Sequence, residues 1–292
     1  MPAKDLMDTD GNHFKILDID GFYVPDFEYK HQERDFRLMV DQWEARDDDI
    51  ILCNYPKSGT HWIWEIIHML YQQRAELIDV TKEGWMMECI SKEKYDSMVS
   101  PRILNSHIYF SMLPKDFLRR KCKLIYTIRN PKDVAVSFYH HHYNLLCYEY
   151  NGSWETYLPR FLSGNVDYMS WFDHAREWHK AMEENKGYPI HCIQYEDMIM
   201  NTISEIKRLA EFLEIKCDET LIQDIYKKSH IDVMKKEKKQ NHSFWKENNS
   251  LMYRKGKIGE WKNVFTVAQN EQFDKVYQEK MADIPLHLKY TL

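Results

Sequence analysis

Residues 55–60, which read Tyr-Pro-Lys-Ser-Gly-Thr, combine the groups that bind phosphate-like anions. They follow a short apolar run at 49–54, and from Thr60 onward apolar residues recur at spacings of three and four. This pattern predicts a buried strand, a loop and an amphipathic helix. A helix N-terminus offers unpaired N–H groups and a positive dipole end to an anion, and Lys57 adds a charge that can follow developing negative charge. Taken alone, the segment equally suits an ordinary surface turn, and it lacks the G-x-x-x-x-G-K-[ST] order of nucleotide P-loops.

Two further segments carry weaker anion signals. Arg129 follows the apolar run 123–128, and Ser137 lies two turns into the next expected helix. Arginine suits a phosphate because its planar fork can contact two oxygens, although a single arginine is more often an ion-pair partner. The run 254–257, Arg-Lys-Gly-Lys, adds cations beside a glycine, and its default interpretation is a solvated charge run.

The elements around these segments alternate between strand and helix. After the strand at 123–128, Asn130 and Pro131 suit the N-cap and first turn of a helix. A third strand is expected at 189–195, followed by a helix that a capping box, Thr202-x-x-Glu205, would open. This alternation predicts an α/β domain with a mainly parallel central sheet flanked by helices. No linker divides the chain, so we expect one domain over 1–292; only 227–259 breaks into a basic, polar, irregular stretch.

Composition excludes several classes of protein. With 43% hydrophobic and 29% charged residues the chain can fill a core, and no apolar run approaches the roughly 18 residues of a membrane span. Residues 1–21 do not resemble a secretory signal. Six scattered cysteines without a C-x-x-C pair favour buried free thiols in a reducing compartment, and a net charge of −6 argues against nucleic-acid binding. Consecutive histidines at 140–142 point about 100° apart on a helix, so we expect no metal site.

Together, 55–60, 129–137 (Arg-Asn-Pro-Lys-Asp-Val-Ala-Val-Ser) and 254–262 (Arg-Lys-Gly-Lys-Ile-Gly-Glu-Trp-Lys) resemble, in order and spacing, the 5′-phosphosulfate loop, 3′-phosphate segment and C-terminal signature of cytosolic sulfotransferases. The resemblance covers nearly the whole chain. It implies a cytoplasmic enzyme with a P-loop-like phosphosulfate loop that moves a sulfuryl group from 3′-phosphoadenosine 5′-phosphosulfate (PAPS) to a hydroxyl, or an amine, of a small molecule such as a phenol, steroid or alcohol. The product nucleotide is 3′-phosphoadenosine 5′-phosphate (PAP), and no metal is required.

The resemblance also assigns residues to this nucleotide. Those expected to hold the 5′-phosphosulfate and the adenine are Lys57, Ser58, Gly59, Thr60, His61, Trp62, Tyr195 and Ser229. Those expected to hold the 3′-phosphate are Arg129, Ser137, Arg254, Lys255 and Gly256. Ile231 stands where an aromatic residue often stacks on adenine, which leaves the strength of PAPS binding open.

The same resemblance identifies His107 as the catalytic base and Lys57 as its electrostatic partner. A lone histidine in such a strand is usually structural, but a neutral imidazole is the natural base for a hydroxyl nucleophile. Some relatives carry a lysine at the position of Asn105, to which we therefore assign no charge. The acceptor pocket is expected at His107 and at four other residues: Phe22, Tyr23, Trp85 and His141. His141 stands where phenol-preferring relatives have an aromatic residue, which favours a more polar acceptor.

Two expectations concern assembly and motion. Lys262, Thr266, Val267 and Glu271 resemble the family's K-x-x-x-T-V-x-x-x-E dimer motif, which implies a homodimer. The polar stretch at about 235–252 is expected to act as a mobile lid that orders on ligand binding, and a passive surface loop is the alternative.

Other functions remain as alternatives to test. A nucleotide kinase would need a Walker A lysine after the second glycine and a magnesium carboxylate, neither of which is apparent. A catalytically idle PAPS-binding or lipophile-binding protein would keep the fold but not need both Lys57 and His107. A membrane-anchored carbohydrate sulfotransferase is disfavoured because residues 1–21 do not suggest an anchor.

Overall fold

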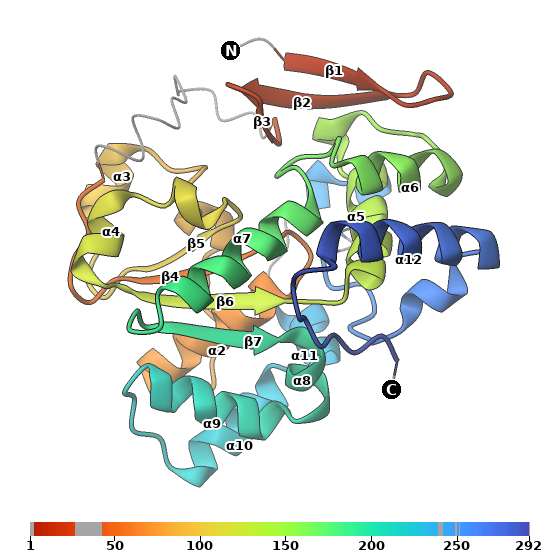
Figure 1. The fold of residues 1–292 in the computed structure, drawn as a ribbon. Helices are drawn as coiled ribbons and strands as arrows, with labels where there is room; N and C mark the ends of the chain where they lie inside the picture. Colours follow the sequence, from red (N-terminus) through yellow and green to blue (C-terminus); the bar gives the residue numbers. More distant parts are fainter. Residues whose placement is uncertain (1–2, 27–42, 239–241, 249, 251, 292) are drawn as a thin grey trace.

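A computed structural model of the chain describes residues 3–26, 43–238, 242–248, 250 and 252–291. At its centre is a four-stranded parallel sheet in the order β5-β4-β6-β7 (Figure 1). These strands are β4 (Ile50–Asn54), β5 (Ile103–Ser106), β6 (Lys123–Ile128) and β7 (Ile190–Gln194). The predicted class, an α/β domain with a mainly parallel sheet, is confirmed.

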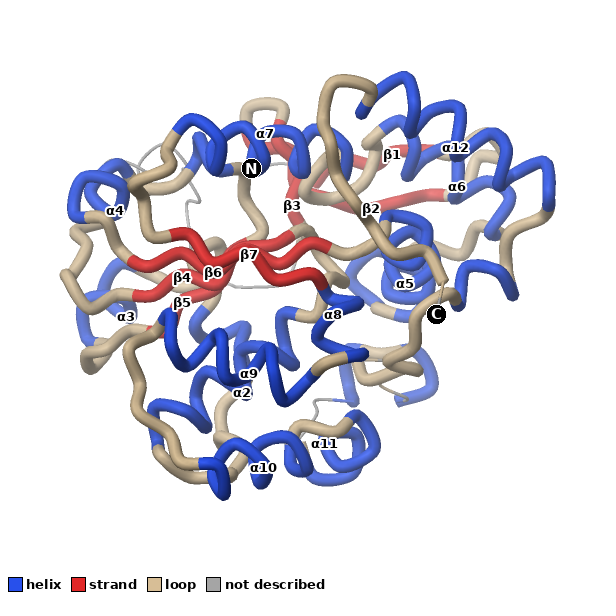
Figure 2. Tube along the Cα trace, turned by 60° about the horizontal axis from the view of Figure 1, so that its bottom comes forward, coloured by secondary structure: helices blue, strands red, loops and turns tan. Residues whose placement is uncertain are grey.

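The sheet is covered on both faces. Successive side chains of β4 enter different hydrophobic clusters: Ile51 and Cys53 join one, and Ile50 and Leu52 the other. Figure 2 shows α7 (Trp171–Glu184) over one face, and α2 (Thr60–Gln72), α9 (Thr202–Phe212) and α10 (Glu219–Lys228) on the opposite side. Strands buried on both faces explain why the apolar runs in the sequence are continuous rather than alternating.

The strand order places a crevice at the carboxyl ends of β4 and β6. After β4 the chain forms β5 on one side, then returns to form β6 on the other. In open parallel sheets ligands bind at such a switch point. The turn into α2 and the turn into α5 (Pro131–Asn144) both open at this place. As predicted, Asn130 caps α5, and its side chain accepts a hydrogen bond from the N–H of Asp133 at 3.0 Å.

The third predicted unit is only partly correct. A short helix that the sequence did not suggest, α8 (Tyr195–Met200), follows β7 directly. The next helix, α9, has Asn201 as its N-cap without a side-chain cap, so the capping box predicted from Thr202 is wrong. The Thr202 hydroxyl instead donates to the carbonyl of Met198 in α8 at 2.6 Å.

The polar stretch 227–259 is more regular than its composition suggested. It contains α11 (Ile231–Glu237) and short 3-10 segments at His242–Phe244 and Lys246–Asn248. Met234 is the buried residue of α11. The predicted lid, 235–252, includes residues 239–241, 249 and 251, which lie outside the described residues, so its behaviour stays a prediction.

The amino-terminal residues form a second, antiparallel sheet, in the order β1 (Ala3–Met7), β2 (His13–Ile19) and β3 (Phe22–Val24). It packs through Phe14 of β2, whose ring stacks on Tyr148 at 5.4 Å between centroids. This small sheet was not predicted.

The remaining elements complete the layers around the site. They are η1 (Lys82–Trp85), α3 (Lys92–Ser97), η2 (Phe110–Met112), α4 (Lys115–Arg120), η3 (Leu146–Tyr148), α6 (Trp154–Ser163), η6 (Glu260–Asn263) and α12 (Val267–Met281). Within the described ranges, every helix is too short or too polar to cross a lipid bilayer. All six cysteines are free thiols, but only Cys53, Cys89 and Cys122 are buried, so the expectation of buried thiols holds for half of them.

Candidate functional site

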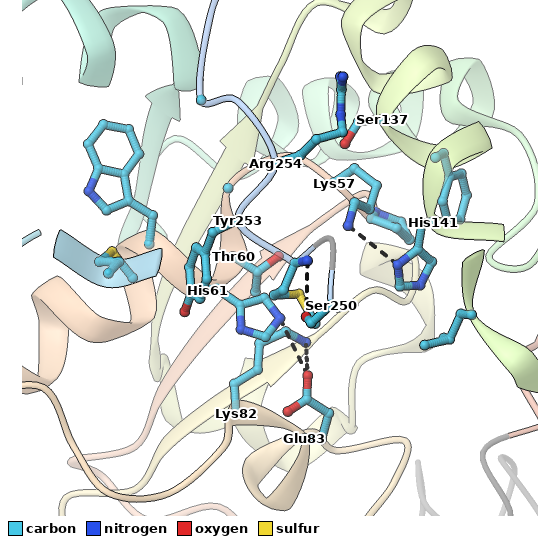
Figure 3. A pocket seen from close by; sticks show the side chains of 18 of the residues that line it. Lys57, Thr60, His61, Lys82, Glu83, Ser137, His141, Ser250, Tyr253 and Arg254 are labelled. Atoms are coloured by element: carbon cyan, nitrogen blue, oxygen red, sulfur yellow. Dashed lines mark hydrogen bonds and ion pairs between the residues drawn. The ribbon is translucent and has the colours of Figure 1, made fainter. Parts of the chain in front are cut away.

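A cavity of about 880 Å³ opens at the carboxyl ends of β4, β5 and β6, and Figure 3 shows it from close by. Most of the residues that the sequence assigned to a nucleotide line it: Lys57, Gly59, Thr60, His61, Trp62, Arg129, Ser137, Tyr195, Ser229, Arg254, Lys255 and Gly256. His107 and His141 line the same cavity. The fold thus brings together segments that are up to about 200 residues apart in the sequence.

The loop between β4 and α2 is shaped for close approach of a ligand to the main chain. Lys57 and Gly59 have φ angles of 67° and 99°, and Gly59 is the N-cap of α2. A Cβ on Gly59 would lie 2.8 Å from Cδ2 of Tyr195, so a side chain there meets both strain and a clash. The Thr60 hydroxyl donates to Asn54 Oδ1 at 2.8 Å, which ties the start of α2 to the end of β4.

Several polar atoms near this loop are buried without a hydrogen-bond partner among the described residues: Ser58 Oγ, Trp62 Nε1 and Arg129 Nε. Buried polar groups are nearly always paired, so each such atom requires an explanation. Ser58 does not line the cavity itself, but it is the neighbour of Lys57 and Gly59, which do. Unused donors around the start of a helix fit an anionic ligand with several acceptor oxygens.

Arg129 links the two segments expected to bind the phosphates, 55–60 and 129–137. Its Nη1 donates to the carbonyl of Lys57 at 2.8 Å, and its guanidinium lies 4.2 Å from the centre of the Tyr195 ring. Arg129 therefore helps to hold the Lys57 loop in its left-handed conformation. Ser137 also lines the cavity, from α5 (Figure 3).

The residues just after the basic segment 254–257 are attached to α5 by hydrogen bonds. The Asp133 carboxylate accepts from the N–H of Gly259 at 2.8 Å and from that of Trp261 at 2.9 Å. Lys255 forms an ion pair with Glu260, and Arg254 lies 3.9 Å from the same carboxylate. At Gly256, φ is 61°, a conformation that favours glycine, and a Cβ there would lie 2.4 Å from Ile231 Cδ1, so the side chain of Ile231 would have to shift.

The ammonium of Lys57 points into the cavity and approaches Nδ1 of His141 at 3.4 Å (Figure 3). Burial, followed by the positive charge of Lys82, lowers the pKa of Lys57 to about 7. The negative charge of Glu83 acts in the opposite direction but less strongly. Lys57 is consequently an amine whose charge depends on what occupies the cavity.

His107 follows β5 directly and is held in one tautomer. Its Nδ1 lies 2.8 Å from the main-chain carbonyl oxygen of Asn54, which can only accept. The hydrogen must therefore be on Nδ1, which leaves Nε2 with a free lone pair in the neutral ring. Burial, followed by the charge of Lys82, lowers the pKa of His107 well below its usual range, so the ring is neutral at pH 7. The main chain is fixed as well, since the N–H of His107 donates to Glu88 at 2.6 Å.

Three residues predicted for an acceptor pocket do not line the cavity. Phe22 packs edge-on against Tyr109 and Tyr168, the hydroxyl of Tyr23 accepts a hydrogen bond from Lys4, and Trp85 packs against His68. The apolar side chains that do line it include Met86, Phe138, Leu145, Tyr168 and Trp245. Sequence spacing could not reveal these walls because they come from separate elements.

The histidines at 140–142 have separate environments. His142 is buried, and its ring nitrogens contact Asp167 at 2.6 Å and Tyr157 at 2.8 Å. His141 instead faces Lys57. The described part of the chain contains no group of three or more histidine, cysteine or acidic side chains placed to hold a metal ion.

Lys82 and Glu83 line the cavity without having been predicted. They belong to η1, a single short turn with no recognisable motif, so only their consecutive opposite charges could have drawn attention to them. Glu83 lies 3.4 Å from Nε2 of His61.

Comparisons with known proteins agree with this arrangement. Residues 47–285 match the family described as Sulfotransferase domain. Sulfotransferase 1B1 of Canis lupus familiaris is 36% identical over 268 residues, which cover 86% of this chain and 89% of that protein. Sulfotransferase 2A1 of Homo sapiens is 36% identical over 261 residues, covering 86% and 90% of the two chains.

Solved structures show the same fold. The crystal structure of mouse sulfotransferase SULT7A1 complexed with PAP is similar with a TM-score of 0.77 and 29% identity, covering 92% of this chain and 96% of that one. Retinol dehydratase in complex with androsterone and PAP has a TM-score of 0.73 and 18% identity, covering 98% and 92%.

Proposed function

This chain belongs to the sulfotransferase family, and we propose that, as a PAPS-dependent sulfotransferase, it transfers the sulfuryl group to a hydroxyl of a small-molecule acceptor with His107 as the base. The observation that carries the proposal is the pairing of Lys57 with a tautomer-locked His107 on one cavity.

The donor nucleotide fits the residues present. Mouse SULT7A1, with which this chain shares 29% identity, binds PAP in its crystal structure. Here Ser58, Trp62 and Arg129 keep buried donors without partners among the described residues. We assign the 5′-phosphosulfate to residues 57–62 and the 3′-phosphate to Arg129, Ser137 and 254–256. The rings of Trp62 and Tyr195, 6.0 Å apart, provide apolar surface for the adenine.

The transfer step is an in-line displacement. When bound, PAPS supplies a sulfuryl group whose S–O bond to the 5′-phosphate breaks as the acceptor oxygen forms the new O–S bond. Nε2 of His107 accepts the acceptor's proton, and Nδ1–H keeps its hydrogen bond to the Asn54 carbonyl. Lys57 stabilises the negative charge that builds on the departing phosphate. Positioning and preorganised charges supply the catalysis, as in phosphoryl transfer.

The cavity walls support the proposed acceptor class. His107 and His141 place polar groups among the rings of Phe138, Tyr168 and Trp245. Such a wall suits a phenol, a steroid or another alcohol with one exposed hydroxyl. The neutral His141, whose pKa burial lowers well below its usual range, adds a hydrogen-bonding group for a more polar acceptor.

Further parts of the proposal rest on the sequence. We keep one domain over 1–292, a lid at 235–252 and a homodimer through Lys262, Thr266, Val267 and Glu271. The dimer proposal is supported by α12, whose first turn exposes 76% of Val267 while Thr266 forms a capping box with Gln269. A cytoplasmic location likewise stays a prediction.

A base variant tests the chemistry. His107→Asn keeps an N–H that can donate to the Asn54 carbonyl but removes the proton acceptor. We expect turnover with PAPS and a panel of phenols, steroids, amines and alcohols to fall at least about 10²-fold, with PAP affinity changed less than about threefold. His191→Asn, which replaces a histidine of β7 outside the cavity, is the matched control and should keep full turnover.

Two results would contradict the proposal. Unchanged turnover of His107→Asn would exclude His107 as the base. A wild-type protein that binds PAP but sulfates nothing in the panel would be the catalytically idle alternative.

A further inference from the structure

Lys82 is buried in the cavity, yet its ammonium has only long contacts. The residue is 5% exposed. The nearest polar atoms are Asn105 Oδ1 at 3.4 Å, the sulfur of Met86 at 3.9 Å and Glu83 Oε1 at 4.0 Å. All are longer than the 2.7–3.2 Å typical of an N–H···O hydrogen bond. An ammonium has three donors, so Lys82 keeps most of its hydrogen-bonding capacity unused.

The two other lysines that are buried among the described residues show what a satisfied ammonium looks like in this protein. Lys132 donates to Asn270 at 2.6 Å and pairs with Asp274 at 2.5 Å. Lys238 pairs with Glu65 and donates to the carbonyls of Ile78 and Val80 at 2.7 and 2.9 Å. Buried lysines are normally paired in this way, because an unpaired buried charge is costly. Lys82 departs from the rule, and such departures concentrate at functional sites.

Asn105 fixes Lys82 at this place. Its Nδ2 donates to the main-chain carbonyl of Lys82 at 2.8 Å, while its Oδ1 faces the ammonium of the same residue. The main chain of Asn105 also accepts a hydrogen bond from the N–H of Met87 at 2.9 Å, which attaches η1 to the end of β5. Since His107 lies two residues beyond Asn105, the ammonium and the imidazole are held by the same strand. Asn105 is itself uncharged, but it positions the ammonium of Lys82.

The charge of Lys82 acts on both groups assigned to the chemistry. Burial lowers the pKa of Lys57 and of His107, and Lys82 is the next largest cause in each case. Figure 3 shows Lys82 entering the cavity beside His61 and Glu83, opposite the side from which Lys57 enters. An anionic group placed between Lys57 and His107 would therefore also lie within the influence of Lys82.

We propose that Lys82, positioned by Asn105, binds the oxygens of the sulfuryl group that is transferred. The proposal rests on the proposed function, since the sulfuryl group is what distinguishes PAPS from PAP. Glu83 balances the ammonium only in part, from 4.0 Å, and leaves its donors for the ligand. In this assignment Lys57 stabilises the departing phosphate, Lys82 binds the sulfuryl group during its transfer, and His107 accepts the proton of the acceptor.

The test compares the affinities of PAPS and PAP, which requires no acceptor and no turnover. Dissociation constants of both nucleotides are measured by calorimetry on the wild type, Lys82→Met and Lys132→Met. We expect Lys82→Met to weaken PAPS about tenfold or more, as for a lost charge-assisted hydrogen bond, and to change PAP less than about threefold. Lys132→Met, which removes a buried lysine outside the cavity, should lower the melting temperature. It should leave the ratio of the PAPS and PAP dissociation constants unchanged.

Lys82→Gln gives the same comparison with a polar side chain, in case the methionine variant does not fold. Equal losses of PAPS and PAP affinity would overturn the proposal, because Lys82 would then be a general phosphate-binding or structural cation. No loss for either nucleotide would also overturn it. A wild-type protein that binds neither nucleotide would instead contradict the proposed function, which the Lys82 variants alone cannot do.

Discussion

The charge of Lys57 should make capture of the donor depend on pH near neutrality. Burial and the positive charges of Lys82, Arg129 and Arg254 lower its pKa to about 7 in the ligand-free protein. His107 does not titrate in this range, because burial lowers its pKa well below 6.5. Raising the pH should therefore remove the charge that we propose binds and stabilises phosphosulfate, while His107, the proposed base, stays neutral.

The size of the effect follows from the pKa. A group with a pKa of about 7 is about 90% charged at pH 6 and about 10% charged at pH 8, so kcat/KM for PAPS should fall about tenfold between these values. The decrease has this sign because the protonated form is the active one. In the loaded enzyme the donor's negative charges raise the pKa of Lys57, so kcat should fall much less over the same range.

The assay is initial-rate kinetics at constant ionic strength, with Lys57→Arg as the control. Arginine stays charged throughout this pH range. The kcat/KM of the Lys57→Arg variant should therefore lack the decrease that deprotonation of Lys57 causes in the wild type. Glu196 also titrates here, because burial raises its pKa to about 7, and the control retains it. Comparing the two profiles isolates Lys57. A flat wild-type profile from pH 6 to 8, or an equal decrease in Lys57→Arg, would refute the reasoning.

Three other predictions address the rest of the site. Arg129→Ala should raise KM for PAPS about 10- to 100-fold with a smaller change in kcat, because it would remove the proposed contact to the 3′-phosphate, which persists through the reaction; PAP binding as tight as wild type by calorimetry would disprove this. Hydrogen exchange should slow across 235–252 when PAP is added, whereas protection limited to 55–62 and 129–137 would mean that this stretch is no lid. Sedimentation at micromolar concentration should show a dimer that Val267→Glu converts to monomer, and a wild-type monomer at moderate salt would exclude the interface.

The anion-binding turns could be predicted from the sequence because their chemistry is local. In the turns after β4 and β6, the strand end, the loop and the helix start are consecutive in the chain, and the cap at Asn130 is a short-range hydrogen bond. Local signals fail where several geometries satisfy them. Thr202 suited a capping box, but α8 ends just before it and Asn201 became the N-cap.

The acid–base part of the site could not be read in the same way, because it is set by contacts between distant segments. The imidazole of His107 is held neutral by burial and by the charge of Lys82, its tautomer is set by the main-chain carbonyl of Asn54, and its main chain is fixed by the carboxylate of Glu88. None of these interactions has a fixed spacing in the sequence. Even the contact between Asn105 and Lys82, on which the role proposed for Asn105 rests, exists only when β5 and η1 are packed together.

Asn54 shows how the two parts become one site. Its main-chain carbonyl selects the tautomer of His107, and its side chain accepts a hydrogen bond from the hydroxyl of Thr60 at the start of α2. The end of β4 therefore positions both His107, the proposed base, and the start of α2, the proposed anion site. Because the carbonyl belongs to the backbone, replacing the Asn54 side chain would remove only the hydrogen bond from Thr60, and the histidine would keep its tautomer. In the proposed mechanism, the alignment of base and donor thus depends on the strand itself, at the switch point where an open parallel sheet binds its ligands.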